Sequence, residues 1–211
     1  MNEPNQLLPR KNPRQQRSEK RVEEIVSAYL RLLERGEARI STNSIAKEAG
    51  VPVSSLYQYF PNKEAIAFSI YDKWASEALE LLRRRSVDAE SAGDVLDFLA
   101  DESGDLFGDI TNARIVLRLG PVMDSTPELK QAKRAFLEEV TAIIADILRK
   151  LGSTWNEAEL ASLVSLLTEL STTTFRHMAR QAPEAAARTY GYWRLGARAM
   201  LVNCIGSSKV S

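Results

Sequence analysis

The chain has 211 residues, 44% of them hydrophobic and 27% charged, a composition typical of a globular protein. A chain of this length can bury a sufficient hydrophobic core without disulfide bonds or a structural metal ion. Its single cysteine, Cys204, excludes an internal disulfide framework and favours a reducing compartment. No segment approaches the roughly 20 apolar residues of a membrane helix, and the N-terminus lacks the apolar core of a signal peptide, so we expect a cytoplasmic protein with no membrane partner.

The formal net charge of zero hides an uneven distribution. Residues 1–63 hold 11 Lys and Arg against 7 Asp and Glu, whereas residues 64–211 hold 17 against 21. Much of the excess lies in a flexible basic arm predicted over residues 1–16, which contains Arg10, Lys11 and Arg14. Such an arm is usually only a solvated tail, but a charge asymmetry between two parts of a chain also favours a polyanionic partner.

Four helices are predicted in the N-terminal part of the chain. Residues 17–35 form the first, because their apolar side chains recur at helical spacing before Gly36. The second runs from an N-cap at Thr42 to Gly50, and the third covers residues 53–59 and ends before Pro61. Asn62 caps a long fourth helix that reaches about Arg85.

Helices are also predicted in the rest of the chain, after residue 85. After a polar connection over residues 86–93, short apolar patterns are broken by glycines up to residue 121. Thr126 caps a helix that ends at Gly152, and Asn156 with Glu159 resembles a capping box that opens the next. A last helix covers residues 184–203. No segment of useful length alternates apolar and polar residues, as a half-buried β-strand would. The predicted fold is therefore all-α: a three-helix head joined by a long helix to a C-terminal helical bundle.

The second and third helices have helix-turn-helix spacing. Ala46 and Ala49 are small where two helices cross, and Gly50 permits the positive φ of the turn. Apolar side chains of the motif are expected to pack on the first helix, which leaves the polar ones outside. The outward set is Ser54, Ser55, Tyr57, Gln58 and Tyr59. A short helix with hydroxyl, amide and phenol groups suits the major groove of DNA, which is about 12 Å wide.

The residues Ile45-Ala46, Ala49-Gly50-Val51, Leu56-Tyr57, Tyr59-Phe60 and Lys63 resemble the signature of the TetR family of bacterial repressors over about residues 20–65. This resemblance implies a DNA-binding domain over residues 17–63 and a ligand-binding and dimerisation domain over residues 64–211. It also implies a repressor that a small-molecule effector releases from its operator. The alternative is a DNA-bound co-regulator or activator that works through protein partners without a small-molecule ligand.

The resemblance also implies contacts to double-stranded DNA. Thr42 and Lys63 match positions that meet phosphate, and the third helix opens where the family reads bases or anchors phosphate. Ser54, Val53 and Tyr59 depart from the glycine, the polar or basic residue and the histidine that are common there. The departure implies an apolar contact for Val53, such as one to a thymine methyl group, whereas the phenol of Tyr59 can still donate to phosphate. Each residue also has a structural alternative as a cap, a core residue or a solvated side chain. The complete candidate set is Thr42, Pro52, Val53, Ser54, Ser55, Tyr57, Gln58, Tyr59 and Lys63, with Arg14 of the arm and Arg17 at the start of the first helix.

Dimerisation is expected, because one recognition helix buries too little surface for a typical specific site. The candidate interface on the last two helices is Leu160, Leu163, Val164, Leu167, Leu170, Trp193, Ala197, Met200 and Leu201, which alternatively face only the core of one chain. A small apolar or amphipathic effector is expected among the middle helices. Candidate lining residues, which are more often plain core, are Trp74, Phe98, Phe107, Met123, Phe136, Phe175 and Met178.

An enzyme is the competing class. One histidine and one cysteine provide no metal cluster of these residues, and no glycine-rich phosphate loop follows a strand. Adjacent acidic pairs such as Glu138 and Glu139 point to different sides of a helix, so they are expected at the solvated surface. No cofactor and no catalytic residue are predicted.

Overall fold

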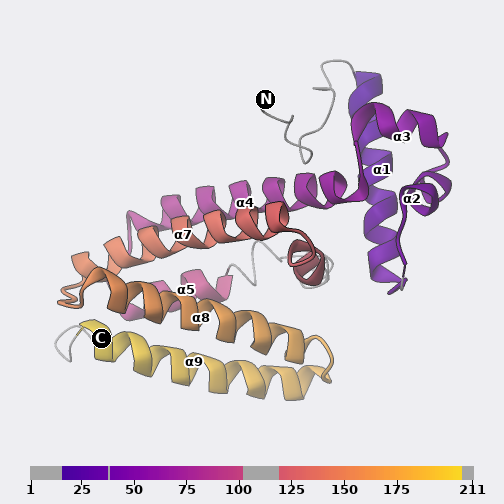
Figure 1. The fold of residues 1–211 in the computed structure, drawn as a ribbon. Helices are drawn as coiled ribbons and strands as arrows, with labels where there is room; N and C mark the ends of the chain where they lie inside the picture. The colour runs from indigo at the N-terminus through magenta and orange to yellow at the C-terminus, as the bar shows by residue number, and fades with distance from the viewer. Residues whose placement is uncertain (1–15, 38, 102–118, 206–211) are drawn as a thin grey trace, which may run out of the picture. The chain divides into compact units, whose positions relative to one another are not determined.

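The computed structural model describes residues 16–37, 39–101 and 119–205, and these contain helices and no strand (Figure 1). The chain divides into two compact units, Met1–Ala75 with Arg114–Lys133 and Ser76–Ala113 with Arg134–Ser211. The division falls inside the long helix, and the boundary between a DNA-binding domain and a C-terminal domain after residue 63 stays a prediction. The all-α prediction is confirmed.

The first unit holds the head, formed by α1 (Gln16–Glu34), α2 (Thr42–Ala49), α3 (Val53–Tyr59) and the start of α4 (Lys63–Ser86). These bounds agree with the predicted helices to within one or two residues. Gly36 has φ 70° and ends the first helix, as its position predicts. The Oδ1 of Asn62 accepts a hydrogen bond from the Ala65 amide at 2.7 Å, so Asn62 caps α4 as expected.

One buried core joins the helices of the head. Ile25 and Tyr29 of α1 pack with Ile45 of α2, Leu56 of α3 and Ile66 of α4, and each is at most 2% exposed. Because burying a side chain of this size contributes about 1.5–3 kcal/mol, this core fixes how the short helices lie on α1. Burial raises the pKa of the Tyr29 phenol, and the nearby negative charge of Glu64 adds to the effect.

The second unit contains the remainder of α4, α5 (Ala92–Asp101), most of α7 (Pro127–Lys150), α8 (Glu157–Met178) and α9 (Pro183–Ile205). Helices α5, α8 and α9 pack against one another (Figure 1). Asn156 and Glu159 form the predicted capping box at the start of α8. No helix within the described ranges is both long enough and apolar enough to cross a membrane.

Candidate nucleic-acid interface

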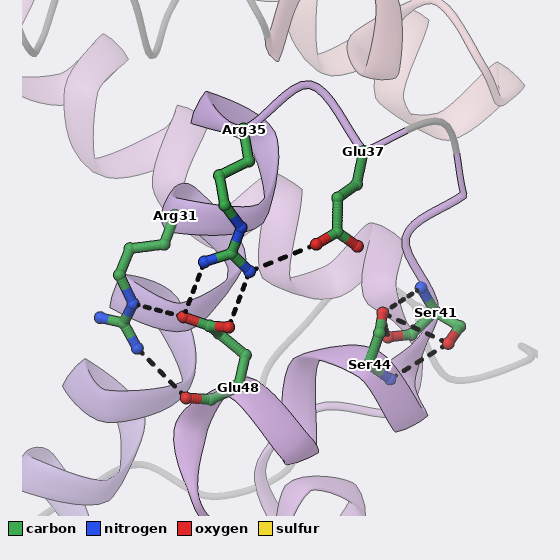
Figure 2. Close-up of polar contacts among 6 residues, drawn as sticks. All are labelled: Arg31, Arg35, Glu37, Ser41, Ser44 and Glu48. Carbon is green, nitrogen blue, oxygen red and sulfur yellow. Dashed lines mark hydrogen bonds and ion pairs between the residues drawn. The ribbon is translucent and has the colours of Figure 1, made fainter.

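Helix α2 begins at a reciprocal cap between two serines. The Ser44 amide donates to Ser41 Oγ at 3.1 Å, and the Ser41 amide donates to Ser44 Oγ at 2.9 Å (Figure 2). The prediction that Thr42 is the N-cap is therefore wrong, because the cap lies one residue earlier. The pattern of two serines three residues apart was the missed signal, since such boxes usually carry Glu or Gln at the later position.

The turn between α2 and α3 depends on Gly50. Its φ of 67° lies in the left-handed region, which glycine adopts without the steric cost that a Cβ brings. A Cβ built there would meet nothing within 4 Å, so the backbone conformation alone accounts for the glycine. The Val51 amide donates to the carbonyl of Ala46 at 3.0 Å and closes α2 as the chain turns.

Helix α3 divides into a buried and an outward side. Leu56 and Phe60 are at most 1% exposed and belong to the core of the head. The exposed residues are Pro52, Ser54, Tyr57 and Gln58, and Val53 and Ser55 are half-buried. The outward group therefore presents hydroxyl, amide and phenol groups, as predicted, on a helix of seven residues that is about 10 Å long.

Tyr59 is the exception to this division. It was expected outside as a polar residue, but only 9% of it is exposed and it packs in the core of the head. That placement was wrong because Tyr59 lies three residues after Leu56, on the same face of a helix. Burial of its ring leaves little surface for a DNA contact.

Two residues predicted to contact DNA, Thr42 and Tyr57, are in contact with each other, and a third, Lys63, lies at the start of α4. Thr42 Oγ1 lies 3.0 Å from the Tyr57 hydroxyl and links the start of α2 to the outward side of α3. Lys63 Nζ donates to the carbonyl of Ile40 at 3.2 Å, and Glu64 Oε1 lies 3.9 Å away. Lys63 is therefore held beside the segment that leads into α2, while 44% of its side chain stays exposed.

A cluster of charged residues joins α1 to α2 on the surface of the head (Figure 2). The carboxylate of Glu48 accepts hydrogen bonds from Arg31 and Arg35, and Arg35 also pairs with Glu37. The donors of Arg35 and then of Arg31 lower the pKa of Glu48 to about 2. This cluster was not predicted from the sequence, although Arg31 and Arg35 lie four residues apart and hence on one face of α1.

The two remaining residues predicted to contact DNA are Arg14 and Arg17, and the structure does not describe their side chains. Arg14 lies outside the described residues, together with the rest of the arm over residues 1–15. Arg17 belongs to α1, but its side chain is outside the described part.

The predicted effector residues are divided between the units. Met123 is buried and Trp74 is half-buried, with its ring 5.5 Å from that of Tyr71, and all three belong to the first unit. Phe136, Phe175 and Met178 belong to the second unit. The Phe98 side chain and Phe107 are outside the described residues. Two open pockets in the second unit, one between α8 and α9 and one between α7 and α8, are lined by other residues.

An aromatic cluster in the second unit contains a buried donor. The Trp193 ring stacks on Tyr190, with centroids 5.8 Å apart, and lies 5.6 Å from the ring of Phe175. Only 7% of Trp193 is exposed, and no hydrogen-bond acceptor meets its indole Nε1 among the described residues. Beside it, Arg194 pairs with Asp97 at 2.7 Å.

The predicted dimer residues lie mostly inside the second unit. Seven of them are at most 7% exposed in the single chain, which leaves almost no surface for a partner: Leu160, Leu163, Val164, Leu167, Trp193, Ala197 and Leu201. Their assignment to an interface is therefore corrected to the core, where α8 and α9 pack together. Of the nine, Leu170 is 39% exposed and Met200 is half-buried.

Metal chemistry has no visible site in the described ranges, where no three His, Cys, Asp or Glu side chains gather to hold an ion. Cys204 is buried, and its Sγ lies 3.1 Å from Ser153 Oγ. Burial raises the pKa of this thiol, so the group is suited to packing and not to nucleophilic attack.

Comparison with known proteins supports the assignment of the head. Residues 25–70 match the model for bacterial regulatory proteins of the tetR family. No curated protein matches the chain significantly.

Solved structures with the same fold cover most of the chain. A transcriptional regulator from Rhodococcus sp. Rha1 has a TM-score of 0.69 at 14% identity, over 90% of this chain and 98% of that one. A putative TetR-family transcriptional regulator from Syntrophomonas wolfei str. Goettingen has a TM-score of 0.65 at 14% identity, over 92% and 99%. SmeT in complex with triclosan has a TM-score of 0.63 at 19% identity, over 87% and 90%.

At these identities the solved structures establish the fold alone. The match over residues 25–70 supports the interpretation of the head as a DNA-binding region. The helix-turn-helix geometry, the outward polar groups of α3 and the left-handed turn at Gly50 agree with that match. Residues 25–70 therefore match the N-terminal region of bacterial regulatory proteins of the tetR family, and the described residues have the fold of the solved transcriptional regulators.

Proposed function

We propose that the protein is a repressor that binds its operator as a homodimer and leaves it when a small molecule binds. DNA binding is supported by the outward side of α3, where Ser54, Tyr57 and Gln58 are exposed while the other side of the helix packs in the core of the head. Base-edge contacts from this side specify sequence, whereas Thr42 and Lys63 are suited to phosphate. A DNA target also implies a cytoplasmic location.

A homodimer is supported by an exposed apolar face on α8 and α9. Leu166 and Leu170 stand four residues apart on α8, while Tyr192 and Leu195 are more than 70% exposed on α9. Isolated apolar side chains are normal at a surface, but a contiguous patch marks an interaction site.

The geometry of a groove supports treating these residues as one face. An open groove of about 580 Å³ is lined by Leu166 of α8 and by Met200 and Asn203 of α9. On α9, Tyr192, Ala199 and Asn203 recur at helical spacing, so they share a side of the helix. Leu166 therefore lies beside the exposed side of α9. We assign the dimer contact to this face, in place of the buried stripe.

Release by a small molecule is supported by the aromatic cluster of the second unit. A buried indole N–H without a partner is costly, and an apolar ligand with one hydrogen-bond acceptor would relieve that cost at Trp193. SmeT, which shares the fold, is known in complex with triclosan, an apolar phenol. Because α4 contributes to both units, it is the element through which ligand binding would reach the head.

Selection from a random duplex library with the full-length protein tests the DNA-binding proposal. We expect enrichment of two related half-sites about one helical turn or a multiple of it apart, because a two-fold dimer reads DNA in that way. Tyr57→Ala should lose the enriched sequence while it stays folded. Failure of the wild-type protein to enrich any sequence would contradict the proposal.

The effector is tested on the selected operator. Triclosan and a panel of apolar phenols and carboxylic acids are titrated into the complex, and release is followed by fluorescence anisotropy. We expect at least one class to release the wild-type protein and to act more weakly on Trp193→Phe, which lacks the indole donor. Retention of DNA with every class would favour the alternative, a regulator that works through protein partners.

A further inference from the structure

The carboxylate of Glu48 is held by two arginines of another helix (Figure 2). Arg31 Nε donates to Oε1 at 2.7 Å, and Arg35 Nη2 donates to Oε2 at 2.7 Å. Arg35 Nη1 adds a contact to Oε1 at 3.2 Å, so the Arg35 guanidinium grips both oxygens. Bidentate Arg–carboxylate pairs of this kind fix geometry as well as supply attraction.

Arg31 also holds the main chain of the same residue. Its Nη2 donates to the carbonyl oxygen of Glu48 at 3.3 Å. The last carbonyls of a helix lack intrahelical partners, and Glu48 stands in the last turn of α2. With its side chain and its carbonyl both held, the end of α2 is fixed in rotation as well as in position on α1.

The place of this contact in the chain gives it a consequence for DNA recognition. Glu48 precedes the left-handed Gly50 by two residues, and α3 starts at Val53. The orientation of the segment that Arg31 and Arg35 hold therefore contributes, together with the buried core, to the direction in which α3 leaves the turn. Glu48 itself does not lie on the outward side of α3.

Stability alone is a weak explanation for the cluster. The Arg31 and Arg35 side chains are 48% and 49% exposed, and exposed ion pairs add little to the free energy of unfolding. Since the pKa of Glu48 lies at about 2, its carboxylate is charged throughout the range in which DNA binding is measured. The charge that the two arginines hold is therefore present under those conditions.

We propose that Glu48 is a positioning residue for DNA recognition: held by Arg31 and Arg35, it fixes the end of α2 and with it the direction of α3. The inference rests on the proposed function, since it concerns how the head reads an operator.

Electrostatics alone would give the opposite sign for removal of the carboxylate. Glu48→Gln raises the net charge by one and frees two guanidinium groups, so simple attraction to phosphate would strengthen binding to any DNA. A misdirected α3 instead loses base contacts and weakens operator binding only. The ratio of operator affinity to random-duplex affinity separates the two, and a merely unfolded head would lose both affinities together.

The test measures that ratio for wild type, Glu48→Gln and Glu37→Gln on the selected operator and on a random duplex at the same salt. We expect Glu48→Gln to lower the ratio about tenfold, the loss that one mismatched base pair typically brings. Glu37→Gln is the matched control, because it makes the same charge change but contacts Arg35 alone. Its ratio should stay within about twofold of the wild type.

A ratio for Glu48→Gln equal to or above the wild type overturns the inference. If Glu48→Gln fails to fold, as judged by circular dichroism, Arg31→Lys decides instead. It keeps the charge but cannot reach the carboxylate and the carbonyl together, so an unchanged ratio would likewise overturn the proposal. Failure of the wild type to select any operator contradicts the proposed function and is a separate outcome.

Discussion

The Thr42 hydroxyl lies 3.0 Å from the Tyr57 hydroxyl, a contact that joins the first turn of α2 to the outward side of α3. One hydroxyl donates to the other, and the acceptor keeps its own hydrogen for a third group. If Thr42 donates, the Tyr57 hydroxyl is aimed outward as a donor. We therefore predict that the two residues act as one unit toward DNA.

Tyr57→Phe and Thr42→Val should each weaken operator binding by about 3- to 10-fold, since each removes one hydrogen bond of ordinary strength. The double variant should lose little more than either single one, because partners in one network are not additive. Operator affinities of the four proteins, measured at one salt concentration, give the coupling. The matched control is Tyr59→Phe, whose ring is buried and whose affinity should not change.

Additive losses in that cycle would contradict the idea of a single unit. A loss for Tyr59→Phe as large as that for Tyr57→Phe would return Tyr59 to the contact surface. Circular dichroism melting of all variants distinguishes these results from unfolding of the head.

Lys63 should act on DNA without regard to sequence. Its ammonium group is held at Ile40, at the approach to α2, where it is suited to a phosphate. Lys63→Gln should weaken operator and random duplex by a similar factor and lower the slope of log affinity against log salt by about one. Lys73→Gln, an exposed lysine further along α4, is the control and should leave the slope unchanged. An unchanged slope for Lys63→Gln would remove Lys63 from the phosphate contacts.

The head was predictable from sequence because its boundaries are set locally. Gly50 and Pro61 interrupt the helices, and Asn62 caps the next, so the bounds of α3 and the start of α4 agree with expectation. Capping and left-handed turns depend on a few neighbouring residues, which a sequence displays directly.

It was harder to predict what each face of a helix packs against. Periodicity identifies the apolar stripe that contains Leu163 and Leu167, but it does not say whether a helix of the same chain or of a second copy covers it. In the structure the same chain covers it, and the exposed residues Leu166 and Leu170 lie on another side of α8. The contact of Glu48 with α1 was also missed, since it depends on how two helices cross.

Leu56 tests the core that supports α3. It is fully buried, so Leu56→Ala should lower the free energy of unfolding by about 2–5 kcal/mol. Gln58→Ala, on the exposed side of the same short helix, should change it by less than about 0.5 kcal/mol. Urea unfolding followed by far-ultraviolet circular dichroism measures both. Equal, small effects would mean that α3 is not anchored through Leu56.

Acid should weaken the contact between α1 and α2. The pKa of Glu48 is lowered from 4.5 to about 2 by the hydrogen bonds from Arg35 and Arg31. A group with a depressed pKa in the folded state stabilises the fold above its unfolded pKa, and this contribution is lost as the pH falls from about 4.5 towards 2. The melting temperature of the wild type should exceed that of Glu48→Gln by a small margin at pH 7, because the pair is partly exposed, and the difference should shrink near pH 3. A difference independent of pH would mean that the charge of Glu48 is not what stabilises the contact.

The exposed face of α8 and α9 should carry the dimer. A charge placed on this face must be buried without a partner when two copies meet there, so the double variant Leu166→Glu with Leu195→Glu should be monomeric. Sedimentation equilibrium compares its mass with that of the wild type at the same concentration. Val87→Glu is the control, because Val87 is 77% exposed but lies outside α8 and α9, and this variant should keep the wild-type mass. The monomer should also bind the operator far more weakly than the dimer, since a single head contacts one half-site. A dimer of unchanged mass in the double variant would move the interface to another surface.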